Sequence, residues 1–264
     1  MNDFAAAKAL HSNKVFYAQF WTHRWKYRFI YDIQIKKMLF LCVLRIASLS
    51  RKSRKVLDIG FGSGQILFTF DKTCEVYGID FSQRAVDEAQ QYSLTKGYRK
   101  SRFLQHDLDA GALPFENRMF DIVVCSHVLE HVLDDRKLLK EIYDVLGDDG
   151  TAVILIPINE RPGDDLNHVR TYTTREFLML LEELNFEVRL VRENEYIGHW
   201  TSGFFLKNYH KRIPLLGFLI SGLINVPLAI LPMRVHRVFD WIFQGLGYKP
   251  RQMACCVSKQ CARQ

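Results

Sequence analysis

A chain of 264 residues can form one elaborated domain or two small ones, and its 48% hydrophobic and 25% charged residues are ordinary globular values. The six cysteines include no CxxC pair and no metal-ligand spacing, so we expect reduced thiols and no metal site. Residues 1–10 lack the charged and then apolar pattern of a secretory signal, so the expected location is the cytoplasm.

The net charge of +7 conceals a segregation of charge along the chain. Residues 1–55 carry 12 Lys and Arg against 2 Asp and Glu, whereas residues 56–197 carry 15 against 26. Residues 198–252 are basic again, with 7 against 1. A basic surface can face an anionic membrane or nucleic acid, or it can be a solvated surface around an acidic domain.

The first 50 residues are expected to be helical. Large apolar side chains recur near helical spacing with basic residues between them, which predicts an N-terminal helical extension. An amphipathic helix that only packs against the domain would show the same pattern. The apolar residues are Phe16, Phe20, Trp21, Trp25, Ile30, Ile33, Met38, Leu39 and Val43.

A strand and a glycine-rich loop follow. Residues 55–59 form an apolar run that contains Asp58, and Gly60, Gly62 and Gly64 follow at alternate positions. Glycines at such a junction allow a sharp turn and a close approach of a ligand. Open parallel sheets bind ligands at the carboxyl ends of their strands, so this loop is the expected site. Residues 65–70 are expected to begin a helix.

A second strand, residues 75–80, ends in Asp80, twenty positions after Gly60, where an acidic residue commonly accepts hydrogen bonds from ribose hydroxyls. A dinucleotide site is the alternative, but the loop lacks the two-residue gap before the third glycine. These residues together resemble the class I S-adenosylmethionine (SAM)-dependent methyltransferases, whose first motif is D-x-G-x-G-x-G. The resemblance is to the small-molecule branch, of the methyltransferase type 11/12 kind, and covers about half the chain, residues 55–186.

Apolar patterning predicts the remaining elements of an alternating α/β chain. The expected helices are residues 82–97, 134–146 and 173–184, with Ser82 and Thr173 as N-caps. The expected strands are residues 102–105, 122–125, 151–156 and 187–191, with a turn at 148–150. The resemblance implies a Rossmann-like seven-stranded methyltransferase sheet with helices on both faces, an N-terminal helical extension and a helical insertion before the last strand.

The resemblance also implies a cofactor, SAM, which leaves as S-adenosylhomocysteine (SAH). Asp58 and the glycine loop would hold the methionine part, and Asp80 would bind the ribose. The remaining cofactor positions are those that would bind or sandwich the adenine or lie near the sulfonium. These are Phe81, Asp107, Leu108 and Ser126. An N-terminal extension often acts as a lid in this family, for which the candidates are Tyr17, Phe20 and Trp21. Asp107 can instead simply form a turn.

His168 is the first candidate for a general base. It lies shortly before the helix start at Thr173, where related methyltransferases often carry a histidine. An imidazole with a pKa near ~6.5 suits deprotonation of a hydroxyl at neutral pH. His168 can alternatively tether its loop by hydrogen bonds. His127, at the end of the fourth strand, is the second candidate, although a histidine near a helix start is often structural.

The chain divides into an extension (1–50), a SAM-binding core (51–197), a basic and apolar helical insertion (198–252) and the last strand with a tail (253–264). Within the insertion, residues 213–233 carry no charged side chain. A single membrane span would put the last strand, residues 253–258, on the wrong side of the bilayer from its sheet. An interfacial helical hairpin, a soluble cap or a homodimer surface are the other interpretations.

The expected function is SAM-dependent transfer of a methyl group to a small or lipid-like acceptor. O-methylation is the first choice, N- or C-methylation is the alternative, and the reaction can take place at the inner face of a membrane. An RNA methyltransferase is disfavoured, because the fourth strand ends in Cys125-Ser126-His127-Val128 and not in N/D-P-P-Y/F. A non-catalytic adaptor with the same fold is disfavoured because the cofactor positions are intact.

Overall fold

A computed structural model of the protein describes residues 31–50, 54–160, 167–194 and 231–260. The proposed lid residues Tyr17, Phe20 and Trp21 lie outside these ranges. The helices are α2 (Tyr31–Ile46), the short 3-10 helix η2 (Leu67–Thr69), α3 (Gln83–Lys96), α4 (Asp135–Val145), α5 (Thr174–Glu183) and α8 (Met233–Gly245). The strands are β1 (Lys55–Ile59), β2 (Glu75–Asp80), β3 (Ser101–Gln105), β4 (Phe120–Ser126), β5 (Leu146–Pro157), β6 (Phe186–Asn194) and β7 (Gln252–Lys259).

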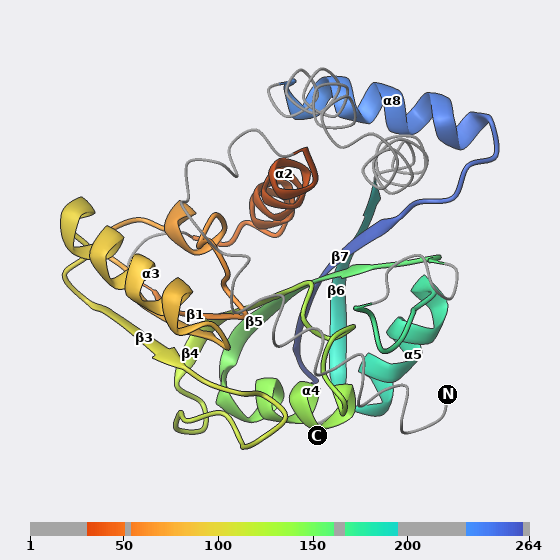
Figure 1. The fold of residues 1–264 in the computed structure, drawn as a ribbon. Helices are drawn as coiled ribbons and strands as arrows, with labels where there is room; N and C mark the ends of the chain where they lie inside the picture. Colours follow the sequence, from red (N-terminus) through yellow and green to blue (C-terminus); the bar gives the residue numbers. More distant parts are fainter. Residues whose placement is uncertain (1–30, 51–53, 161–166, 195–230, 261–264) are drawn as a thin grey trace, which may run out of the picture.

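These strands form one seven-stranded sheet in the order β3-β2-β1-β4-β5-β7-β6 (Figure 1). The first five strands along the chain pair in parallel, and β7 runs antiparallel between β5 and β6. The predicted α/β fold with a Rossmann-like seven-stranded sheet is therefore confirmed, and the last strand lies where the sequence places it. Central strands that are buried on both faces explain the near-continuous apolar runs in β4, β5 and β7.

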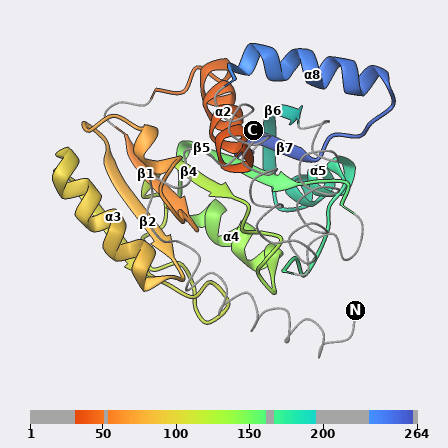
Figure 2. The same cartoon turned by 45° about the horizontal axis from the view of Figure 1, so that its top comes forward.

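Helices cover both faces of the sheet, so there are two hydrophobic clusters (Figures 1 and 2). One cluster joins α4 and α5 to the sheet, and the other joins α2 and α3 to the opposite face. Adjacent residues in a strand point to opposite faces, which is why Cys255 packs in the first cluster and Cys256 in the second. The sheet is therefore fixed from both sides, and its strand ends hold the loops above it.

Two local predictions are wrong. The segment expected to begin a helix at residues 65–70 contains only η2, because the backbone leaves the helical region at Phe68 (ψ 19°) and is extended at Phe70. The expected turn at residues 148–150 is instead part of β5, which begins at Leu146 opposite Phe120 and passes an irregularity in the β4 pairing. The first difference leaves the glycine loop without a long helix behind it.

Helix caps follow the expected chemistry. Ser82 accepts from the backbone N–H of Ala85 at the start of α3, and Gly97 ends that helix with φ +78°. Thr173 and Glu176 form a capping box at the start of α5. Leu94 on α3 is 69% exposed and does not contribute to the core.

The described part of the insertion is α8 and the chain that leads into β7. Residues 198–230 of the predicted insertion lie outside the described ranges. Across the described residues, every helix is too short or too polar to traverse a bilayer. α8 lies on the side of the sheet that carries α2, away from α4 (Figures 1 and 2).

Candidate functional site

The glycine loop lies at the switch point of the sheet, where β1 has β2 on one side and β4 on the other. Gly60, Gly62 and Gly64 have φ values of +66°, +52° and +65°, a region that side chains rarely adopt. The N–H of Gly60 donates to the carbonyl of Ile79 (2.8 Å), which fixes the loop to the end of β2. A Cβ on Gly60 would lie 2.4 Å from Cγ2 of Val128, so the loop also packs closely on the segment after β4.

Asp58 and Asp80 flank this loop and are both buried, at 2% and 7% exposure. The N–H groups of Gly62 and Ser82 donate to the two oxygens of Asp80 (2.8 and 2.9 Å), so Asp80 fixes the loop from the end of β2. Burial, followed by the nearby charge of Asp80, raises the pKa of Asp58 well above its usual range. Burial also raises the pKa of Asp80, against the lowering effect of its two backbone donors. Two buried carboxylates beside one loop favour a cationic ligand.

The three predicted adenine residues follow the neighbouring strands. Phe81 and Leu108 are partly buried beside the ends of β2 and β3. Gln105 donates from its side-chain amide to the carbonyl of Phe81 (3.1 Å), which links the two strand ends. Asp107 accepts from the N–H of Asp109 (3.1 Å), which is the turn-forming contact that the sequence left as an alternative role. That contact uses one carboxylate oxygen.

The segment after β4 has an unusual backbone at its first residue. Ser126 ends the strand, and the N–H of His127 donates to the carbonyl of Leu155 on β5 (2.8 Å). His127 has φ +56°, a conformation that a residue with a Cβ adopts at a cost and that often accompanies functional sites. The turn directs the chain across the end of the sheet toward Glu130.

Glu130, which belongs to this segment, has a completely buried side chain. Its Oε1 lies 3.2 Å from Nδ1 of His127 and 3.9 Å from Nε2 of His131. The rings of His131 and His168 are in edge-on contact, with centroids 4.9 Å apart. A fully buried carboxylate and three imidazoles therefore form one cluster at the ends of β4 and β5.

His168 is supported by a second carboxylate. Its Nδ1 lies 2.5 Å from Oε2 of Glu160, which comes from the loop after β5. Arg251 lies 3.6 Å from the other oxygen of Glu160. His131 has an analogous partner, because its Nδ1 lies 3.0 Å from the carbonyl oxygen of Asn167. In both histidines, then, an acceptor faces Nδ1.

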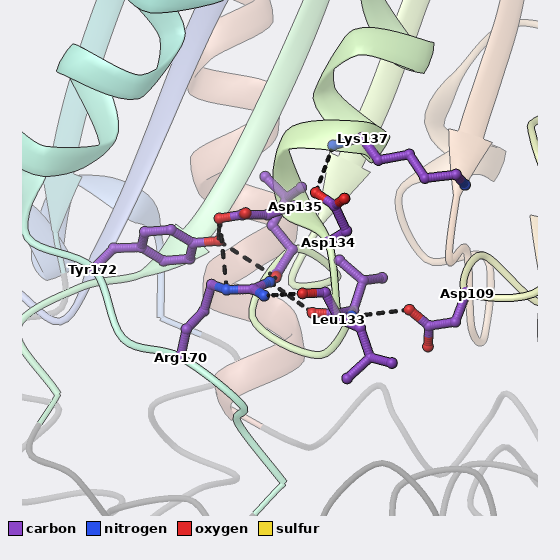
Figure 3. Close-up of polar contacts among 9 residues, drawn as sticks. Asp109, Leu133, Asp134, Asp135, Lys137, Arg170 and Tyr172 are labelled. Carbon is purple, nitrogen blue, oxygen red and sulfur yellow. Dashed lines mark hydrogen bonds and ion pairs between the residues drawn. The ribbon is translucent and has the colours of Figure 1, made fainter. Parts of the chain in front are cut away.

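Arg170 connects the loop after β5 to the loop after β4 (Figure 3). Its guanidinium donates to the carbonyls of Leu129 (2.7 Å), Val132 (2.6 Å) and Leu133 (2.6 Å). Tyr172 donates to Asp135 (2.8 Å), which Arg170 also approaches at 3.6 Å. The loop after β5 thus clamps the segment that carries Glu130 and His131.

The structure brings most of the predicted site residues to one edge of the sheet. The sequence did not identify Glu130, Glu160 or Arg170 as site residues. The spacing His127-x-x-Glu130-His131 was a readable signal, since it groups three polar side chains between apolar ones. Nothing local in the sequence links Glu160 or Arg170 to that motif.

Comparison with known proteins finds a match to a family described as "Methyltransferase domain", over residues 57–154. An uncharacterized methyltransferase of Bacillus subtilis, YcgJ, is 34% identical over 106 residues, which are 40% of this chain and 41% of that protein. A demethylmenaquinone methyltransferase of Lactobacillus johnsonii is 35% identical over 103 residues, 38% of this chain and 42% of that protein. The chain thus matches about two fifths of the length of these curated relatives.

Likeness to solved structures extends over more of the chain. Coclaurine N-methyltransferase, solved with N-methylheliamine and SAH, aligns with a TM-score of 0.57 and 14% identity. The alignment covers 86% of this chain and 71% of that one. At this identity the likeness shows the fold, and the family match covers the segment from β1 into β5, including the glycine loop.

Proposed function

We propose that this chain, which carries a class I SAM-dependent methyltransferase domain, transfers the methyl group of SAM to a small or lipid-like acceptor. Asp58 and the glycine loop would hold the methionine part, and Asp80 the ribose. Asp107 would bind the adenine amino group between Phe81 and Leu108, with Ser126 near the sulfonium. The reaction is an in-line displacement, to which the protein contributes mainly proximity and orientation.

One observation carries this proposal: two buried carboxylates flank a loop of three glycines with positive φ. Burying a carboxylate without a cationic partner costs stability, as the raised pKa values of Asp58 and Asp80 indicate. A ligand with a cationic amino group, a sulfonium and ribose hydroxyls would offset that cost. The demethylmenaquinone methyltransferase among the relatives supports an acceptor of small or lipid-like type.

Calorimetric titration with SAM and with SAH tests the cofactor site. We expect saturable binding of both, and at least ~10-fold weaker binding in Asp80→Asn, equivalent to about 1.4 kcal/mol. Glu75→Gln, at the partly exposed start of the same strand, is the matched control and should bind like the wild type. Absence of saturable binding in the wild type would refute the proposed function.

O-methylation is the proposed reaction, with His168 as the residue that accepts the acceptor's proton. Glu160 beside Nδ1 favours the tautomer that carries its proton there, so the lone pair is on Nε2. His168→Asn keeps a donor for Glu160 and removes Nε2. We expect kcat to fall about 100-fold or more for a hydroxyl acceptor in a screen with methyl-labelled SAM. Unchanged kcat for such an acceptor would exclude this role.

We also propose that α8 attaches the protein to an anionic membrane surface. Val238, Trp241, Ile242 and Leu246 are 54%, 74%, 41% and 68% exposed, and their spacing puts them on one side of the helix. Arg234, Arg237 and Lys249 are exposed on α8 or just after it. An exposed apolar stripe with tryptophan and adjacent basic residues is typical of helices that lie in the interface of a bilayer.

Sedimentation with vesicles tests the attachment. We expect the protein to pellet with vesicles that contain phosphatidylglycerol and to remain in solution with phosphatidylcholine alone. Trp241→Ser should reduce pelleting several-fold, whereas Leu94→Ser, an equally exposed apolar residue on α3, should not change it. A homodimer that buries the stripe is the competing outcome. It would appear as a dimer mass that Trp241→Ser converts to a monomer, with no pelleting.

A further inference from the structure

We propose that Glu130, His131 and His168 form a binding site for a divalent transition-metal ion. The inference rests on the proposed methyl transfer only for what the ion would do, and not for whether it binds. One ligand atom from each residue lies within 4.8 Å of the other two. No metal site was expected from the sequence, because its cysteines lack ligand spacing and these three side chains come from two separate loops.

The first argument is that Glu130 is a buried carboxylate without a hydrogen-bond donor among the described residues. Its side chain is 0% exposed, and across the described part of the chain no donor makes a hydrogen bond to either oxygen. The 3.2 Å contact with His127 and the 3.9 Å approach of His131 are too poorly directed or too long to satisfy them. A buried carboxylate needs a positive partner in direct contact. A divalent ion in the cluster would provide one.

The second argument is the tautomeric state of the two histidines. A histidine that ligates a metal usually donates its other ring N–H to a carboxylate or a carbonyl, which orients the ring and fixes the tautomer. His168 faces Glu160 with Nδ1 (2.5 Å), and His131 faces the carbonyl of Asn167 with Nδ1 (3.0 Å). Both contacts put the proton on Nδ1 and the lone pair on Nε2. Arg251 fixes Glu160 in turn.

The ligand set selects the class of ion. Two imidazoles and one carboxylate suit Zn²⁺, Mn²⁺, Fe²⁺, Co²⁺ or Ni²⁺, whereas Mg²⁺ and Ca²⁺ prefer oxygen alone. Ligands bonded at about 2.1 Å in a tetrahedral site are roughly 3.4 Å apart. The ligand atoms, now within 4.8 Å of one another, would therefore approach by up to about 1.4 Å around the ion. Three protein ligands leave coordination positions open for a further oxygen.

An acceptor hydroxyl is the proposed occupant of an open position. Coordination lowers the pKa of a bound hydroxyl, and the proton passes to solvent. The oxygen then forms its bond to the methyl carbon as the carbon–sulfur bond of SAM breaks, and SAH leaves. In the metal-loaded protein, His168 is therefore a ligand, and its role as a base is confined to the metal-free protein.

The experiment uses the full chain after chelator treatment and titrates it with Co²⁺ and Zn²⁺. We expect saturable binding of one ion, with a visible Co²⁺ spectrum typical of nitrogen and oxygen ligands and no thiolate charge-transfer band. Glu130→Gln and His131→Asn should weaken the affinity at least ~100-fold, and Glu160→Gln about 10-fold, as expected for a residue that orients a ligand. His106→Asn is the control histidine and should bind the ion like the wild type.

The alternative is an ion-pair network in which a protonated histidine neutralises Glu130. In that case no variant would change the binding of Co²⁺, or the wild type would bind none, and the proposal would be overturned. A thiolate band would overturn it as well, because it would place the ion on cysteine. SAM titration of the same variants separates the two proposals. A wild type that binds SAM but no Co²⁺ refutes only the metal site, and absence of SAM binding in the wild type refutes the methyltransferase function.

Discussion

Gly60 shows how a single position controls the loop. Its φ of +66° costs an L-residue about 1–2 kcal/mol, and a methyl group there would meet Cγ2 of Val128 at 2.4 Å. Gly60→Ala should therefore lower the free energy of unfolding by about 2–4 kcal/mol, from backbone strain and overpacking together. Chemical denaturation with a two-state fit measures the change.

The double variant Gly60→Ala/Val128→Ala separates the two contributions at this position. Val128→Ala removes both methyl groups of this buried residue, which relieves the contact but leaves φ unchanged. With Val128→Ala alone as the reference, we expect recovery of only part of the stability that Gly60→Ala loses. Full recovery would mean that the positive φ carries no cost, and no recovery would mean that the contact does not matter. Either result would contradict the packing described for the loop.

At the scale of elements, local patterns predict most of the fold because strands and helix caps are encoded by neighbouring residues. The alternation of strands and helices from β1 to β5 follows from the sequence, and so do the cap residues Ser82 and Thr173. Residues 65–70 do not, because the same apolar residues fit a helix or the short turn of η2, which ends where Phe70 becomes extended.

The residues of the candidate site also fall into a group that the sequence predicts and a group that it does not. Asp58, Asp80 and the glycines are near one another in sequence and belong to a recognisable motif, so they could be predicted. The cluster of Glu130 with His168 could not, because its members are brought together only when the loops after β4 and β5 pack across the sheet edge. A pattern within one segment carries no information about which segment lies opposite.

The packing of the loop after β5 against the loop after β4 depends on Arg170, which bonds to carbonyls of the latter. Arg170→Lys keeps the charge but cannot reach the carbonyls of Leu129, Val132 and Leu133 together. We expect a loss of about 1–3 kcal/mol in the free energy of unfolding, because carbonyls lose their donors. Thermal denaturation measures it, and faster backbone amide exchange near residues 129–133 identifies the loosened segment.

Arg189→Lys is the matched control for that experiment, since Arg189 is an exposed arginine on β6 that bonds to Ser258 and pairs with Glu187. It should change the free energy of unfolding by less than about 0.5 kcal/mol. If Arg170→Lys were as mild as this control, the three carbonyls would have to be satisfied in another way, and Arg170 would not position the loop.

At the scale of the whole molecule, the sheet places two buried carboxyl groups, Asp58 and Asp80, at the carboxyl ends of β1 and β2, where burial disfavours their ionised forms. Burial raises the pKa of Asp58 and of Asp80 in the folded state. A raised pKa in the folded state means that the associated stability is present below the ordinary carboxyl range and is lost as pH rises through the raised values. The ligand-free protein should therefore lose stability as pH rises through that window.

SAM should reverse this trend, since its cationic groups favour the ionised carboxylates. The increase in Tm on adding saturating SAM should grow as pH rises above the ordinary carboxyl range, as more ionised Asp58 becomes available to the ligand. Differential scanning fluorimetry at several pH values, with and without SAM, measures the difference.

Asp58→Asn isolates the residue responsible. An amide still accepts the backbone N–H of Leu67 that bonds to Asp58, but carries no charge, so the ligand-free variant should melt a few degrees higher than the wild type at about pH 8. Its stabilisation by SAM should be smaller and nearly independent of pH. Glu75→Gln, at the partly exposed start of β2, should keep the wild-type dependence on pH and SAM. If the SAM-induced shift is as large in Asp58→Asn as in the wild type, the cationic part of the ligand does not rest on this carboxylate.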